Sequence, residues 1–88
     1  MKKSMREAIS DALDLPKDTL LDLPKIILTG NKEVFIENYK GIVEYTDEVI
    51  RLNTSTHMLR ITGKNLGIRE IGDDEITLFG DVLSVEFI

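Results

Sequence analysis

Apolar and polar residues alternate along most of the chain from Lys25 onward, in short runs separated by glycine, asparagine and aspartate. Alternation with a period of two is typical of strands that bury one face, and these three residue types favour turns. The pattern therefore predicts about eight short strands that follow one another closely. Their approximate ranges are 25–29, 33–37, 41–46, 49–53, 57–62, 65–71, 75–79 and 82–87.

The alternation is clearest in the last four predicted strands. One buried face and one hydrated face are the usual arrangement of antiparallel sheet. We expect Leu59, Ile61, Leu66, Ile68, Ile76, Leu78, Val85 and Phe87 on the buried face, and Arg60, Thr62, Arg69, Thr77, Ser84 and Glu86 on the other. Many short strands with brief links predict a small roll or barrel, or a sandwich. A β-solenoid stays open as an alternative, because alternation alone does not separate these folds.

Five segments between the predicted strands have the composition of tight turns. Residues 29–32 (TGNK) and 62–65 (TGKN) place glycine where a hairpin needs a positive φ angle. Residues 79–82 (FGDV) fit a type II′ turn, and residues 45–48 (YTDE) and 72–75 (GDDE) suit type I turns.

The first residues predict a short amphipathic helix over residues 4–14. Ser4 and Glu7 form a capping box, and Pro16 ends the helix. Its apolar face comprises Met5, Ile9, Ala12 and Leu13. This face is expected to serve one of two purposes. It either docks the helix on the sheet or binds a partner or a membrane surface. Residues 1–24 are thus expected to form a helix and a proline-bracketed connector, and residues 25–88 a β domain, within one structural domain.

Length and charge narrow the class of protein. Eighty-eight residues allow one modest core, and a chain this short gains stability from self-association. The net charge of −5 disfavours a nucleic-acid partner. No apolar run is long enough for a membrane span, and acids interrupt the segment where a signal peptide needs an apolar core. We expect a cytoplasmic protein.

The chain offers little catalytic chemistry. His57 is the only histidine and there is no cysteine, so no zinc site is expected. The three acids of residues 72–75 lack the alternating ligand spacing of a calcium loop. The glycines are scattered singly, unlike those of a phosphate-binding loop. We therefore expect no enzyme activity and no catalytic, cofactor-binding or metal-binding residues.

The segment IENYKGIVEYTDEVIRL, residues 36–52, combines both tyrosines with several charged residues. One interpretation makes it strands and turns, with Ile36, Ile42, Val49 and Leu52 in the core. In this interpretation Glu44 and Arg51 pair across adjacent strands. The other interpretation is that this segment forms an interaction surface, because tyrosine side chains are favourable at interfaces. The candidate surface residues are Glu37, Asn38, Tyr39, Tyr45 and Arg51.

Three blocks of the chain resemble the YabP/YqfC family of sporulation proteins, and its YqfC branch in particular. They are LPKDTLLDLPKIILTGN (residues 15–31), IENYKGIVEYTDEVIRLNT (residues 36–54) and LRITGKNLGIREIGDDEITLFGDVLSVEFI (residues 59–88). The ALDLPKD segment, residues 12–18, also resembles that branch. The resemblance implies an endospore-forming bacterium, expression in the mother cell, and a YqfD-type membrane protein as partner. It supplies no catalytic residues.

Two hypotheses of function follow. The first is a non-enzymatic interaction or scaffold module in spore-envelope assembly in the mother cell. The alternative is a self-assembling structural protein that forms homo-oligomers through edge strands. It rests on the last predicted strand, which ends in SVEFI and is expected at a sheet edge.

Overall fold

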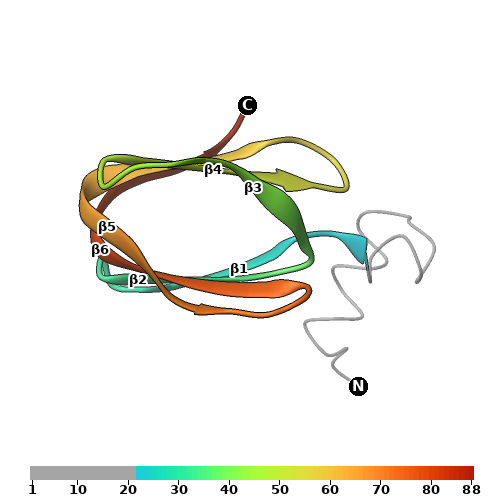
Figure 1. Cartoon of the computed structure of the whole chain (residues 1–88), viewed down its shortest axis with the longest axis horizontal. Coiled ribbons are helices and arrows are strands. Elements are labelled where there is room, and N and C mark those ends of the chain that lie inside the picture. The colour runs from blue at the N-terminus through green and yellow to red at the C-terminus, as the bar shows by residue number, and fades with distance from the viewer. Residues whose placement is uncertain (1–21) are drawn as a thin grey trace, which may run out of the picture.

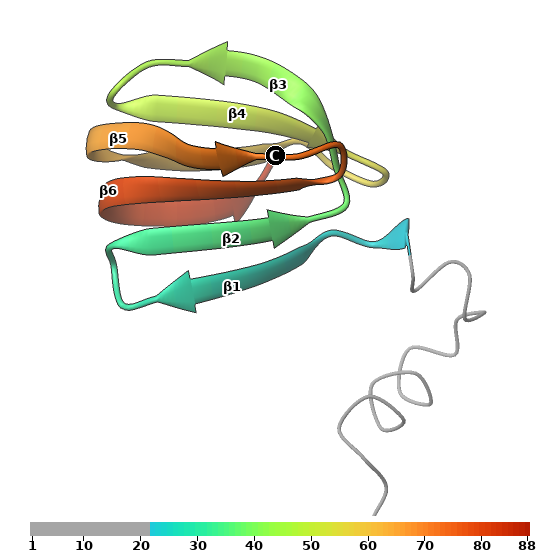
Figure 2. The same ribbon diagram turned by 60° about the horizontal axis from the view of Figure 1, so that its bottom comes forward.

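Six antiparallel strands form one sheet in the computed structural model, which describes residues 22–88 (Figure 1). The strands are β1 (Lys25–Thr29), β2 (Glu33–Glu37), β3 (Tyr39–Tyr45), β4 (Val49–Thr54), β5 (Leu59–Ile71) and β6 (Glu75–Phe87). Their order across the sheet is β1-β2-β6-β5-β4-β3, as Figure 2 shows. The predicted helix over residues 4–14 lies outside the described residues, as does most of the predicted connector.

Two of these strands are twice as long as the sequence pattern suggested. Strands β5 and β6 each contain 13 residues and replace two predicted strands apiece, so there are six strands rather than eight. The predicted turns at residues 62–65 and 79–82 are instead bends inside β5 and β6. Glycine inside a strand commonly marks a bend or a bulge, and its sequence signal resembles that of a turn. The turns at residues 29–32, 45–48 and 72–75 are confirmed as links between strands.

The bends fold the sheet back on itself, so that two layers face each other across the core (Figure 1). The first, here called the β1 layer, contains β1, β2, residues 75–79 of β6 and residues 67–71 of β5. The second, the β3 layer, contains β3, β4, residues 59–62 of β5 and residues 82–87 of β6. Strands β5 and β6 therefore belong to both layers and join them.

Glycine allows β5 and β6 to approach closely at the bends. A Cβ atom on Gly63 would lie 2.1 Å from the carbonyl oxygen of Asp81, and one on Gly80 would lie 2.6 Å from that of Asn65. Gly80 also has a φ of 133°, which L side chains rarely adopt. These positions require glycine because of the close contact between the two backbones.

The core between the layers is entirely apolar apart from one tyrosine hydroxyl. Its buried residues are Val34, Ile36, Tyr39, Ile50, Leu52, Leu59, Ile61, Leu66, Ile76, Leu78 and Val82. Ile26, Ile68 and Val85 pack against this cluster while remaining partly exposed. Burial of these side chains is the main source of stability for such a small sheet.

The predicted class of mainly antiparallel β structure is confirmed, with a more open arrangement than a barrel. Strands β1 and β3 end the strand order and do not pair with each other, so the sheet is not closed. All ladders between the described strands are antiparallel, which differs from the parallel coils of a β-solenoid.

Candidate interaction surface

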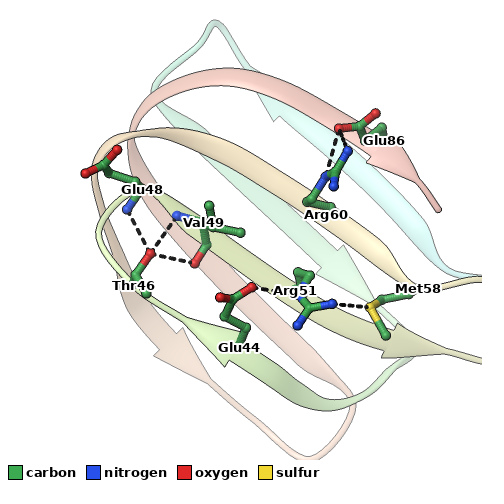
Figure 3. A network of polar contacts seen from close by, with 8 residues as sticks. All are labelled: Glu44, Thr46, Glu48, Val49, Arg51, Met58, Arg60 and Glu86. Carbon is green, nitrogen blue, oxygen red and sulfur yellow. Dashed lines mark hydrogen bonds and ion pairs between the residues drawn. The ribbon is translucent and has the colours of Figure 1, made fainter.

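A row of four charged residues crosses the outer face of the β3 layer (Figure 3). Glu44 of β3 lies opposite Arg51 of β4, Arg51 lies opposite Arg60 of β5, and Arg60 lies opposite Glu86 of β6. Arg51 Nε donates to Glu44 Oε1 at 2.7 Å, which confirms the predicted pair. Arg60 donates to Glu86 Oε1 from Nε at 3.0 Å and from Nη2 at 2.8 Å.

The order of charges in this row explains how two arginines are accommodated side by side. Like charges directly opposite each other destabilise a ladder. Here each arginine has a glutamate on its other side, so the row Glu44–Arg51–Arg60–Glu86 carries no net charge. Arg51 Nη1 also lies 3.6 Å from the thioether sulfur of Met58. These side chains are about one-third to two-fifths exposed, so each ion pair is worth roughly 0.2–1 kcal/mol.

A threonine sets the turn that brings β3 and β4 into this register. Thr46 Oγ1 accepts hydrogen bonds from the backbone N–H groups of Glu48 at 3.2 Å and Val49 at 2.8 Å (Figure 3). The backbone N–H of Thr46 donates to the carbonyl of Val49 at 2.8 Å. A side chain that satisfies turn amides in this way fixes the hairpin, and hence the pairing of Glu44 with Arg51.

Two of the predicted surface residues form a corner of the fold. Asn38 alone links β2 to β3, which lie far apart in the strand order, and it has a φ of 65°. Its N–H donates to the carbonyl of Asp74 at 2.6 Å, and its side-chain amide donates to the carbonyl of Leu23 at 2.9 Å. Tyr39 is 7% exposed and donates its hydroxyl proton to the carbonyl of Gly72 at 2.9 Å. Both residues therefore stabilise the crossing between the layers.

The five residues proposed from the sequence do not share one surface. Glu37 lies in the β1 layer, between Lys25 and Glu75 in register. Arg51 belongs to the charged row on the β3 layer. Tyr45 ends β3 and is 52% exposed. Of the two tyrosines, only Tyr45 offers its ring to a partner from a largely accessible position.

The structure reveals a set of exposed apolar residues, of which the sequence singled out only Tyr45 as a surface residue. Each lies opposite a fully or almost fully buried residue in its ladder, and so belongs to the core-facing side of the sheet. The pairs are Leu28 with Val34, Ile42 with Leu52, Tyr45 with Ile50, Ile71 with Ile76, and Phe87 with Leu59. The first residues of these pairs, Leu28, Ile42, Tyr45, Ile71 and Phe87, are here called the apolar rim and are 40–59% exposed. Within residues 22–88, the core face is therefore only partly covered at the sheet edges.

Ile42 and Phe87 were expected in the core, but they are 40% and 52% exposed, because exposure depends on the position of a strand in the sheet. A residue on an edge strand has a neighbour on one side only, and strand order comes from long-range pairing. The periodicity of the sequence does not indicate the order of the strands.

A separate hollow of about 360 Å³ lies on the outside of the fold, near the bend of β6. It is lined by Lys32, Asn65, Arg69, Phe79, Gly80 and Asp81. Lys32 forms an ion pair with Asp81. Arg69 donates to Glu33 at 2.7 Å and lies 5.7 Å from the centre of the Phe79 ring. Lys32 and Arg69 thus already pair with carboxylates, so this hollow would bind an anion only weakly.

Lys32 also affects the ionisation of its partner. Its hydrogen bond, followed by its positive charge, holds the pKa of Asp81 below the usual range, and Lys64 adds a smaller effect in the same direction. Asp81 remains charged over the physiological range, so this pair is a surface contact between the β1–β2 turn and β6.

Within residues 22–88, no group of three or more histidine, aspartate or glutamate side chains is arranged to hold a metal ion. In the same range, no helix is both long and apolar enough to cross a bilayer.

Comparison with known proteins confirms the resemblance in the sequence. The YabP family matches residues 22–88. The chain is 32% identical over 87 residues to the Bacillus subtilis (strain 168) protein described as "Uncharacterized protein YqfC", covering 99% of this chain and 94% of the relative. No solved structure matches the fold significantly.

Proposed function

This chain belongs to the YabP family, and from that premise we propose that it is a non-enzymatic sporulation protein that acts as an interaction module in spore-envelope assembly. It works in the cytoplasm of the mother cell, where a YqfD-type membrane protein is its partner. The observation that carries this proposal is the apolar rim, because a core face only partly covered at the edges suits contact with another chain.

The partner contacts the edge formed by β3. Ile42, Val43 and Tyr45 are 40%, 42% and 52% exposed and follow one another on this strand. Tyrosine next to aliphatic residues is favourable at an interface, because its ring adds apolar area and its hydroxyl stays hydrated. Glu44 extends this edge with a charge that is already paired to Arg51.

Co-purification of the chain with a YqfD-type membrane protein in mild detergent tests this proposal. The variant Ile42→Ser/Tyr45→Ser should lose the complex. The variant Ile71→Ser should retain it, because Ile71 is a rim residue on β5 that is at least as exposed as Ile42 and Tyr45. Circular dichroism establishes that both variants fold. Retention of the complex by the folded Ile42→Ser/Tyr45→Ser variant would reject the β3 edge, and no complex with the original chain would reject the partner.

A second candidate function is self-assembly through sheet edges. It is favoured by the second half of β6, since β2 pairs with β6 only over residues 75–79. In the strand order β6 lies between β2 and β5, but among the described strands residues 83–87 pair with β5 alone, at the end of the chain where the sequence suggested an edge. Light scattering over a range of concentrations tests this function, and a strict monomer would reject it.

A further inference from the structure

Each layer of the folded sheet has two edges, because β5 and β6 pair with different neighbours along their lengths. In the β1 layer the edges are β1 and residues 67–71. In the β3 layer they are β3 and residues 83–87. An edge strand presents unpaired backbone groups that can bind a further strand.

Three of these edges carry features that discourage strand addition. Strand β3 has two register shifts, and residues 67–71 contain a shift between Ile68 and Glu70 together with the charge of Arg69. Strand β1 is only five residues long and begins with Lys25. Bulges, charges and short length are the usual means of blocking edge pairing.

The fourth edge is regular over residues 84–87. A register shift precedes them at Leu83, where Ser84 lies opposite Thr62 and Val82 opposite Gly63, and the Val82 N–H already donates to the carbonyl of Asn31 at 2.8 Å. Residues 84–87 pair continuously with β5, from Thr62 opposite Ser84 to Leu59 opposite Phe87. The apolar side chains along this edge are Leu83, Phe87 and Ile88, which are 72%, 52% and 44% exposed. This edge thus combines an open ladder with apolar side chains that no described neighbour covers.

The sequence of this edge is symmetrical in polarity about Val85. Reading VLSVEFI from residue 82 to residue 88 gives two apolar residues, a polar one, Val85, a polar one and two apolar ones. In an antiparallel pair centred on Val85, Leu83 would lie opposite Phe87 of the second copy, and Ser84 opposite its Glu86. Every apolar residue then meets an apolar one, and the two glutamates avoid each other.

We propose that residues 83–87 pair antiparallel with the same residues of a second copy of this chain, with a two-fold axis at Val85. A self-complementary patch of this kind is what a two-fold interface requires. The pairing joins two β3 layers into one continuous sheet and covers Leu83 and Phe87. The inference rests on the second candidate function, self-association, and gives it a site and a register.

Sedimentation equilibrium on the full chain tests the site. The original chain should show a monomer–dimer equilibrium, and Leu83→Lys and Phe87→Lys should each weaken it at least tenfold. The matched control Ile71→Lys places the same charge on a different, equally exposed edge and should leave the dimer intact. An original chain that stays monomeric overturns both the inference and self-association. Dimerisation that resists Leu83→Lys and Phe87→Lys, or is weakened equally by Ile71→Lys, overturns the site alone.

The register has its own test at Ser84, whose hydroxyl bonds to Thr62 in the monomer. Ser84→Lys and Ser84→Glu both remove this bond, but they place opposite charges beside Glu86 of the second copy. Cross-strand charge pairs favour opposite signs, so Ser84→Lys should dimerise roughly tenfold more tightly than Ser84→Glu, and the difference should shrink in high salt. Equal dissociation constants for the two variants would overturn the register centred on Val85.

Neither result depends on the proposed membrane partner. The partner contacts β3, which is the opposite edge of the same layer, so Leu83→Lys should not affect co-purification. Failure of the dimer and failure of the partner complex are therefore separate outcomes.

Discussion

Phe87 lies directly opposite Leu59 in the β5–β6 ladder, yet Leu59 is completely buried and Phe87 is 52% exposed. The difference arises because β5 has β4 on its other side at this point, while none of the described strands lies on the outer side of the end of β6. The same contrast recurs along the apolar rim. Core-facing side chains at the edges of this sheet remain accessible to another chain.

This contrast predicts unequal effects of truncating the two residues. Leu59→Ala should lower the free energy of unfolding by about 2–5 kcal/mol, because it leaves a cavity in the packed core. Phe87→Ala should lower it by less than about 1.5 kcal/mol, because the lost side chain was half in water. Urea denaturation at a concentration where the chain is monomeric measures both. Equal losses would mean that Phe87 is part of the core.

The charged row on the β3 layer should contribute modestly and depend on salt. Glu86→Gln should destabilise the fold by roughly 0.5–1 kcal/mol, since it leaves Arg60 beside Arg51 without its own glutamate. Adding Glu44→Gln should cost more than the sum of the single changes, because both arginines then lack a counter-charge. Thermal denaturation at low salt and in 1 M NaCl, where the screening length falls to about 3 Å, measures this effect. A loss that high salt does not reduce would contradict the assignment to electrostatics.

The pair between Lys32 and Asp81 should make stability sensitive to acid. The pKa of Asp81 is lowered in the folded chain, so the pair stabilises the fold above the usual pKa of aspartate, and this contribution is lost as pH falls through the folded value. Lys32→Met should return the pKa of Asp81 towards its usual range, whereas Lys64→Met should change it less. NMR titration of the Asp81 carboxyl carbon measures both. An unchanged pKa in Lys32→Met would exclude this pair as the cause.

The bends should tolerate no side chain on glycine. Gly80→Ala would bring a Cβ atom against the Asn65 backbone at a φ of 133°, and should destabilise the fold by about 1–3 kcal/mol. Gly41→Ala is the matched control, because no atom lies within 4 Å of its added Cβ. Denaturation of both variants measures their free energies of unfolding. A neutral Gly80→Ala would show that the bend relaxes easily.

The sequence predicted strands well where alternation was unambiguous. The bounds of β1 and β2 match the prediction, as do the three true turns. It could not separate a turn from a bend at residues 62–65 and 79–82, because both use glycine for close backbone approach. Whether the chain reverses direction at these glycines depends on the tertiary fold.

Assignment of the core failed where two apolar residues are adjacent. Val49 was expected inside, but it lies opposite Thr62 on the outer face, and Ile50 is buried in its place. Since Val49 and Leu52 are three residues apart in one strand, they face opposite sides, and the burial of Leu52 requires Ile50 to point inward. Tyr39 was placed on a surface because its residue type suits both positions. Its burial follows from the one-residue crossing at Asn38, which no local pattern indicates.

We propose that this protein acts through the edges of its sheet. Amide hydrogen exchange, followed by mass spectrometry, tests it most directly when the free monomer is compared with the concentrated chain and with the partner complex. New protection is expected at residues 83–87 on concentration and at residues 39–45 on partner binding, with little change in β2 and β4. Protection confined to β2, β4 or the hollow around Phe79, or no new protection in either state, would contradict it.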